Sequence, residues 1–157
     1  MKLSTKGRYG VRAMVDLALH YDKQDDNQEA IPLHCIADRQ DISEHYLEQL
    51  IAPLREAGLV NSVRGANGGY LLAKEPTDIT VKDIIRELEG PIAPVECVEK
   101  EAGSSCENVE DCITRLIWKK LRNSINEVLD SITLEDLRQE AVDAKEKGGH
   151  CGHLYHI

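Results

Sequence analysis

The feature that most restricts the fold of this chain is a glycine-rich turn between two short runs of strand-forming residues. The runs are residues 59–63 and 70–73, and the turn between them, residues 64–69, contains three glycines and one asparagine. Two such runs joined by Gly and Asn predict an antiparallel β-hairpin. One small hairpin is therefore expected at this place in the chain.

Three helices are predicted before the hairpin. Apolar residues recur at helical spacing over residues 4–21, and a short helix is expected through Ala37 and Arg39. A longer helix is expected over residues 43–57, because Ser43 is a good N-cap and the apolar residues after it form one stripe. That buried stripe consists of Leu47, Leu50, Ile51 and Leu54.

The end of the third predicted helix leads directly into the hairpin. Pro53 is expected to bend this helix or to end its first part, and Gly58 is expected to close it. A short helix, a tight turn, a second helix with a polar face and a following hairpin make the plan of a winged helix-turn-helix. The predicted fold class is mainly α with a small β-hairpin wing and a long dimerisation helix.

The second half of the chain is predicted to be helical around an irregular loop. A helix over residues 80–88 ends at residues 90–94, the segment 97–112 has no sustained apolar period, and a long helix spans residues 114–132. The broad apolar stripe of the long helix suits an antiparallel dimer contact, although packing on its own domain alone is the alternative. The predicted regions are a DNA-binding domain at 1–90, a cysteine-bearing loop at 91–113, a dimerisation region at 114–142 and a flexible tail at 143–157.

The distribution of charge allows a nucleic-acid partner in spite of a net charge of -9. Residues 1–74 carry 9 basic and 10 acidic side chains, so most of the acidity lies in the second half. Lys6 and Arg8 precede the first acidic residue and lie at the start of the first predicted helix, where positive charge opposes the helix dipole. A role in phosphate binding explains this placement, and an ordinary solvated helix start is the alternative.

Composition and motifs exclude several classes of protein. No apolar run is long enough to span a bilayer, and the N-terminus lacks a secretory signal, so the protein is expected in the cytoplasm. The sequence contains no phosphate-binding glycine loop and no nucleophile elbow, so we do not expect an enzyme. A protein-interaction module would leave the wing and the basic N-terminus unexplained.

Motifs across nearly the whole chain resemble the Rrf-type winged helix-turn-helix transcriptional regulators, which include the IscR, NsrR and CymR types. The resemblance rests on four segments, which are residues 4–9, 45–50, 58–60 and 62–70. Residues 88–92 and the late helix are most similar to the CymR type. The resemblance implies a homodimer on a palindromic double-stranded DNA operator, with the recognition helix in the major groove and the wing in the minor groove.

The same resemblance implies which side chains contact DNA. Gln49 is suited to the edge of adenine and Glu48 to cytosine N4, whereas Tyr46 is expected to contact phosphate or to pack. For Glu48 a purely structural surface role is the alternative, since an acid near phosphates also repels them. The predicted contact residues are Lys6, Arg8, Ser43, Tyr46, Glu48, Gln49, Arg64 and Gly65.

Three of the five cysteines lie within sixteen residues, and the resemblance implies that they hold an iron-sulfur cluster, of the 2Fe-2S kind. These ligands are Cys97, Cys106 and Cys112, because thiolates are the preferred ligands of such clusters. More residues separate Cys97 from Cys106 than separate the first two cysteines of IscR-like proteins. Arg115 occupies the position at which IscR-like proteins carry a histidine ligand. A zinc site, a thiol redox switch and the absence of any function are the alternatives. The open candidates for a fourth ligand are Glu107, Asp111, a tail histidine, a residue of a partner subunit, Cys35 and Cys151.

The C-terminus provides a second functional hypothesis. CymR-type proteins act with cysteine synthase, an enzyme whose active site accepts peptides that end in Ile. This chain ends with Tyr155, His156 and Ile157, although His156 departs from the aromatic residue of that type. Tyr155 and Ile157 are therefore the predicted contacts with cysteine synthase, in a regulator of cysteine metabolism.

Overall fold

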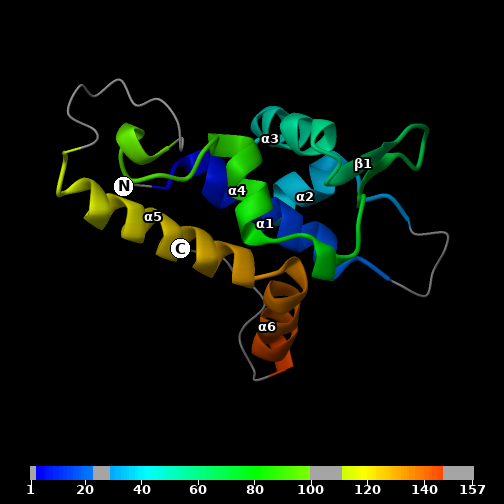
Figure 1. Cartoon of the computed structure of the whole chain (residues 1–157). Helices are drawn as coiled ribbons and strands as arrows, with labels where there is room; N and C mark the ends of the chain where they lie inside the picture. Colours follow the sequence, from blue (N-terminus) through cyan, green and yellow to red (C-terminus); the bar gives the residue numbers. More distant parts are fainter. Residues whose placement is uncertain (1–2, 23–28, 100–110, 147–157) are drawn as a thin grey trace.

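The computed structural model describes residues 3–22, 29–99 and 111–146. It consists of six α-helices within those ranges, with one two-stranded antiparallel sheet (Figure 1). The predicted fold class is confirmed. The elements are α1 (Thr5–Leu19), α2 (Leu33–Gln40), α3 (Glu44–Glu56), β1 (Val60–Val63), β2 (Gly69–Leu72), η1 (Pro76–Asp78), α4 (Val81–Glu89), η2 (Glu96–Val98), α5 (Arg115–Ser131) and α6 (Leu134–Glu146).

Helix α1 lies at the centre of the helical part and is attached to the end of α4. Ser4 caps α1, and Glu89 Oε1 accepts hydrogen bonds from the Ser4 backbone at 2.9 Å, the Ser4 hydroxyl at 2.8 Å and the Gly7 backbone at 3.1 Å. Gly10 allows the two helices to approach closely, because a Cβ atom there would overlap Leu88. The Glu89 carboxylate therefore connects the basic start of α1 to the C-terminal end of α4.

Helices α2 and α3 form the predicted helix-turn-helix. Asp41 adopts the left-handed conformation at the end of α2 (φ 53°), and Ser43 caps α3 as predicted. Of the two outcomes expected at Pro53, a bend or an end of the first part of the helix, the second does not occur, because α3 continues through Pro53 to Glu56. A proline removes one backbone donor and crowds the carbonyl four residues earlier, but the adjacent Leu54 is fully buried in the core. Gly58, with φ 72°, then ends the helical segment as expected.

The second strand of the wing is joined to the segment before α2, close to the turn of the hairpin. Val60 pairs with Leu72 and Val63 with Gly69 in β1 and β2. Ile31 adds a further bridge to Tyr70, with backbone hydrogen bonds of 3.0 and 2.9 Å. Gly69 is needed at this point, because a Cβ atom there would overlap the backbone of Ile31. The wing is thus attached both to α3 through the chain and to the helix-turn-helix through Ile31.

The hydrophobic core lies between α1, α2, α3 and α4, and it is aliphatic. The predicted stripe of α3 is buried, and Leu134 of α6 reaches the same core. The largest fully buried side chains are Met14, Ile36, Leu47, Leu50, Ile51, Leu54, Ile79, Ile84, Leu134, Val60 and Val98. No helix in the described ranges is long and apolar enough to cross a membrane.

The C-terminal part differs from the prediction, because a second helix follows α5. Thr133 and Asp136 form reciprocal side-chain to backbone hydrogen bonds at the start of α6. This T-x-x-D capping box ends the long helix and begins a new one. Helix α6 extends to Glu146, so residues 143–146 are helical rather than part of a tail. The rest of the predicted tail, residues 147–157, lies outside the described residues.

Candidate functional site

The exposed face of α3 carries three polar side chains at the spacing of one helical turn. His45, Glu48 and Gln49 are exposed, whereas Leu47 and Leu50 are buried in the core. Gln49 Nε2 lies 3.1 Å from His45 Nε2. Glu48 and Gln49 were predicted from the sequence, but His45 was not, although its place beside them one turn earlier was a usable signal.

Ser43 and Tyr46 hold the start of α3 in place. The Ser43 hydroxyl oxygen accepts a hydrogen bond from the Tyr46 backbone at 3.2 Å, which leaves its proton available for a phosphate. The half-buried Tyr46 ring packs edge-on against Tyr9, with ring centroids 6.0 Å apart, and Arg12 lies 5.0 Å above the Tyr9 ring. Tyr46 is therefore mainly a packing residue that links α3 to α1.

The tip of the wing presents its polar groups to solvent. Arg64 and Gly65 are both exposed, at the end of β1. Gly65 has a φ of 119°, and its carbonyl accepts a hydrogen bond from the Gly68 backbone at 3.0 Å. Because a side chain at this φ is strained, Gly65 maintains the turn that carries Arg64.

The basic side chains at the start of α1 are also exposed. Lys6 and Arg8 lie in the first turn and a half of α1, on the exposed side of a helix whose Gly7 and Gly10 are buried against α4. Their exposure is consistent with the predicted phosphate contacts. Figure 1 shows α3 and the wing on the same part of the molecule.

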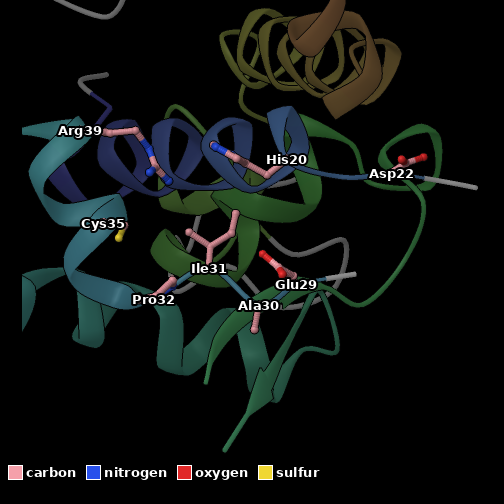
Figure 2. Close-up of a pocket in the computed structure, with 8 residues that line it drawn as sticks. All are labelled: His20, Asp22, Glu29, Ala30, Ile31, Pro32, Cys35 and Arg39. Carbon is pink, nitrogen blue, oxygen red and sulfur yellow. The ribbon is translucent and has the colours of Figure 1, made fainter. Parts of the chain in front are cut away.

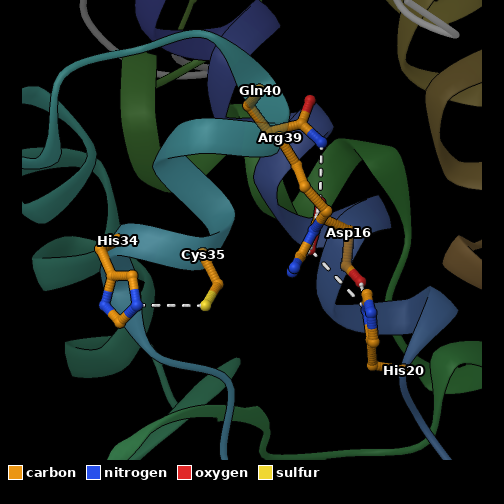
Figure 3. A network of polar contacts seen from close by, with 6 residues as sticks. All are labelled: Asp16, His20, His34, Cys35, Arg39 and Gln40. Carbon is orange, nitrogen blue, oxygen red and sulfur yellow. Dashed lines mark hydrogen bonds and ion pairs between the residues drawn. The ribbon is translucent and has the colours of Figure 1, made fainter. Parts of the chain in front are cut away.

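A buried acid holds α1 and α2 together behind this surface (Figure 3). Asp16 is 2% exposed, and its carboxylate accepts hydrogen bonds from Arg39 Nη2 at 2.6 Å and Arg39 Nε at 3.0 Å, and from Gln40 Nε2 at 2.8 Å. Arg12 donates to the Gln40 carbonyl at 2.8 Å. The hydrogen bonds that Arg39 donates to Asp16 raise the pKa of Arg39. This network joins the first helix of the helix-turn-helix to the Tyr9 and Tyr46 pair.

A hollow of about 430 Å³ opens next to this network (Figure 2). Its lining residues come from the end of α1, the segment before α2 and α2 itself, and they include Cys35 and Arg39. Cys35 Sγ lies 3.3 Å from His34 Nε2. The lining carries both signs of charge, because Asp22, Glu29 and Arg39 are among its residues.

Two of the three clustered cysteines lie within the described residues, and Arg115 contacts the backbone of both. Arg115 Nε donates to the Cys97 carbonyl at 3.4 Å, and the Arg115 backbone donates to the Cys112 carbonyl at 3.1 Å. Arg122 Nη1 donates to the Val98 carbonyl at 2.7 Å, which attaches η2 to α5. Cys112 Sγ lies 3.2 Å from Thr114 Oγ1, and this hydrogen bond lowers the pKa of Cys112. Cys106 lies outside the described residues.

The other candidate ligands do not complete a metal site among the residues that the structure describes. No group of three His, Cys, Asp or Glu side chains within those ranges is arranged to hold a metal ion. Asp111 is exposed, and Cys35 lies in the hollow beside α2. Glu107, Cys151 and the tail histidines lie outside the described residues, as do Tyr155 and Ile157.

Helix α5 exposes an apolar face along most of its length. None of its residues is buried, although its inner side packs on α4 and η2. The exposed apolar residues recur at helical spacing on one side. They are Leu116, Ile117, Leu121 and Val128, between 42% and 64% exposed, and Ile113, just before the helix, is 82% exposed.

The chain is similar to known regulators along almost its whole length. The family model for Rrf2, an iron-dependent transcriptional regulator, matches residues 3–140. The HTH-type transcriptional regulator CymR of Bacillus subtilis is 50% identical over 137 residues, which is 87% of this chain and 89% of that protein. HTH-type regulators named IscR, such as that of Photorhabdus laumondii, are similar as well, in this case 42% identical over 91% of this chain and 84% of that protein.

The solved structures agree with the sequence comparisons. The structure of B. subtilis CymR, the global cysteine regulator of that organism, has a TM-score of 0.70 and 48% identity, and the match covers 89% of this chain and 98% of the other. The structure of T. potens IscR also has a TM-score of 0.70, with 47% identity over 99% of this chain and 97% of the other.

Proposed function

The chain belongs to the Rrf2 family of transcriptional regulators, and we propose that it represses transcription as a homodimer on a palindromic DNA operator, under the control of a cysteine-ligated iron-sulfur cluster. The observation that carries the DNA part is the exposed polar face of α3 beside the exposed tip of the wing, whose second strand is hydrogen-bonded to Ile31 before α2. As a regulator of transcription, the protein acts in the cytoplasm, where the DNA lies.

The exposed side chains support base reading by α3 and backbone contacts elsewhere. Gln49 matches the donor and acceptor pair of adenine in the major groove, and Glu48 accepts from cytosine N4. Arg64 has the length and charge for the minor groove, and Lys6 and Arg8 suit phosphates. The acidic second half of the chain does not oppose this binding, because these contacts all belong to residues 1–74.

Replacing Arg64 with Ala is expected to weaken operator binding about tenfold and to reduce the dependence of affinity on salt, since one cation no longer neutralises a phosphate. Fluorescence anisotropy with a labelled operator, measured over a series of salt concentrations, tests this. Lys119→Ala, which removes the same charge from the exposed surface of α5, is the matched control and is expected to bind as the wild type does. Equal affinities of the two variants would contradict the role of the wing, and sequence-independent binding by the wild type would contradict the proposed function.

The exposed face of α5 supports a symmetric dimer. Four large apolar side chains on one helix are a surface that a second copy of the same helix covers well, because an isologous interface places each patch against its equal. Two recognition helices related by a two-fold axis then match the two halves of a palindromic operator.

The cysteine segment fits an iron-sulfur cluster in the chemistry of its donors. Cys97, Cys106 and Cys112 would hold the cluster, as three thiolates close together in the chain, and Arg115 contacts the backbone of the first and the last. A bound cluster supplies a centre whose assembly and loss depend on iron and on oxidants. The fourth ligand remains among the candidates given above.

The residues around the cysteines suggest how this segment affects DNA binding. Arg115 and Arg122 attach the Cys97 segment to α5, the proposed dimer helix. Glu89, a few residues before this segment, attaches the end of α4 to the start of α1. A change in the cysteine segment therefore acts on two elements, the proposed dimer helix and the basic start of α1. Both elements orient the helix-turn-helix and the wing on DNA.

Anaerobic reconstitution with iron and sulfide is expected to give a coloured protein that contains both. Alanine at Cys97, Cys106 or Cys112 is expected to abolish the visible absorption, because each removes a thiolate ligand. Absorption spectroscopy with iron, sulfide and zinc analysis measures this. Cys35→Ala is the comparison variant, because it loses the colour only if Cys35, in the hollow beside α2, is the fourth ligand. A colourless wild type without iron would contradict the cluster, and zinc bound in its place would identify a zinc site.

A second candidate function is the control of cysteine metabolism without a cluster. The identity of 50% with B. subtilis CymR favours it. In this case cysteine synthase is the partner and binds the C-terminal residues Tyr155 and Ile157, or the cysteines act as a thiol redox switch. An iron-free protein in the reconstitution experiment would favour this candidate over the first.

A further inference from the structure

One hydrogen bond on the exposed face of α3 connects two side chains that face solvent. Gln49 Nε2 lies 3.1 Å from His45 Nε2, four residues earlier. The amide nitrogen of Gln can only donate, so the ring nitrogen of His45 accepts, and the His45 proton lies on Nδ1. In this pair, Gln49 is therefore the hydrogen-bond donor and His45 the acceptor.

This hydrogen bond orients the Gln49 amide. Its NH₂ group points toward residue 45, one turn nearer the start of the helix, and no residue that the structure describes is hydrogen-bonded to its carbonyl oxygen. One amide hydrogen is used by His45, while the second hydrogen and the oxygen remain for another molecule. An exposed Gln without such a bond rotates about three torsions, so His45 restricts the group before any ligand arrives.

His45 lies at the end of the helix that matters most for base reading. Ser43 is the cap of α3 and Glu44 its first residue, so His45 belongs to the first turn. The N-terminal residues of a recognition helix are those that contact base edges. Adenine is recognised by an amide that presents its donor and its acceptor in one fixed order, and reversal of the amide exchanges the two.

We propose that His45 is a specificity-determining residue, which positions the Gln49 amide and thereby sets the base preferred at the position that Gln49 reads. This inference rests on the proposed function, because it requires that α3 enters the major groove. It adds a residue whose side chain acts through another one. The contrasting possibility is a simple surface pair that stabilises the helix, in which case base preference does not depend on His45.

The test measures base preference with the full-length protein. Wild type, His45→Ala, Gln49→Ala and the double variant each select from a pool of randomised operators, and competition with single-base operator variants then gives relative affinities. For His45→Ala, the preference at one position of each half-site is expected to fall about three- to tenfold, since the ordering of the amide is no longer provided. Preference at the other positions, melting temperature and salt dependence are expected to stay as in the wild type.

The double variant separates positioning from direct reading. If His45 acts through Gln49, the double variant loses no more preference than Gln49→Ala does alone. His45→Asn, which keeps a side-chain acceptor, is expected to recover part of the preference, and His34→Ala on α2 is the control for loss of an exposed histidine. Unchanged preference in His45→Ala, or additive losses in the double variant, would overturn the inference. A wild type that selects no sequence would contradict the proposed function and this inference together.

Discussion

Replacing Asp16 with Ala is expected to lower the free energy of unfolding by about 3 kcal/mol, the largest loss of stability we expect from a single polar side chain of this protein. The carboxylate is 2% exposed and accepts hydrogen bonds from Arg39 and from the buried Gln40. Its removal leaves the Gln40 amide without its partner. The loss falls at the lower end of the range for buried pairs, because the Arg39 side chain is 40% exposed and can turn to water.

Chemical denaturation of the purified protein measures this effect. The matched control is Asp130→Ala, which breaks the exposed pair with Lys82 at 3.0 Å and is expected to cost less than about 1 kcal/mol. Asp16→Asn keeps the shape and one acceptor oxygen, so an intermediate loss is expected. An Asp16→Ala variant no less stable than Asp130→Ala would show that the network does not hold α1 and α2 together.

Replacing Ile117 with Glu is expected to convert the dimer into monomers and to weaken operator binding about a hundredfold or more. Ile117 is 58% exposed in the single chain, in the middle of the apolar face of α5. A symmetric interface would bring two added carboxylates into one apolar contact, where unpaired charge is strongly unfavourable. Sedimentation equilibrium measures the association, and anisotropy with whole and half operators measures the binding.

The control for this variant is Asn123→Glu, which adds the same charge to an exposed position of α5 about a third of a turn around the helix from Ile117. It is expected to remain dimeric. A monomeric wild type, or an Ile117→Glu variant that stays dimeric, would assign another role to this face.

Local sequence signals were sufficient to predict the helix-turn-helix and the wing. Ser43, Gly58 and the turn at residues 64–69 each encode one boundary, and all three lie where expected. A helix end at Pro53, one of the two outcomes expected there, does not occur, and the adjacent Leu54 is buried in the core. The start of α6 was missed although Thr133 and Asp136 carried a capping signal, since the apolar stripe suggested one continuous region.

The contacts between distant residues were beyond sequence reasoning. Ser4 is hydrogen-bonded to Glu89, and Asp16 to Arg39. No sequence spacing indicates that residues more than twenty positions apart are partners. The pairing of His45 with Gln49 was predictable in spacing but not in direction, because direction depends on which atoms face each other. Of the three cysteines, Cys106 lies outside the described residues, so the ligand set stays a prediction.

The bridge between Ile31 and Tyr70 has a consequence for the length of DNA that this protein accepts. The second strand of the wing is hydrogen-bonded, close to the turn, to the residue that precedes the helix-turn-helix, and Gly69 leaves no room between them. This bridge restricts movement of the wing relative to α3. If the proposed major-groove and minor-groove contacts are made, we expect one base pair inserted between them in a half-site to weaken binding, so that the protein would distinguish operators by their spacing as well as by their bases.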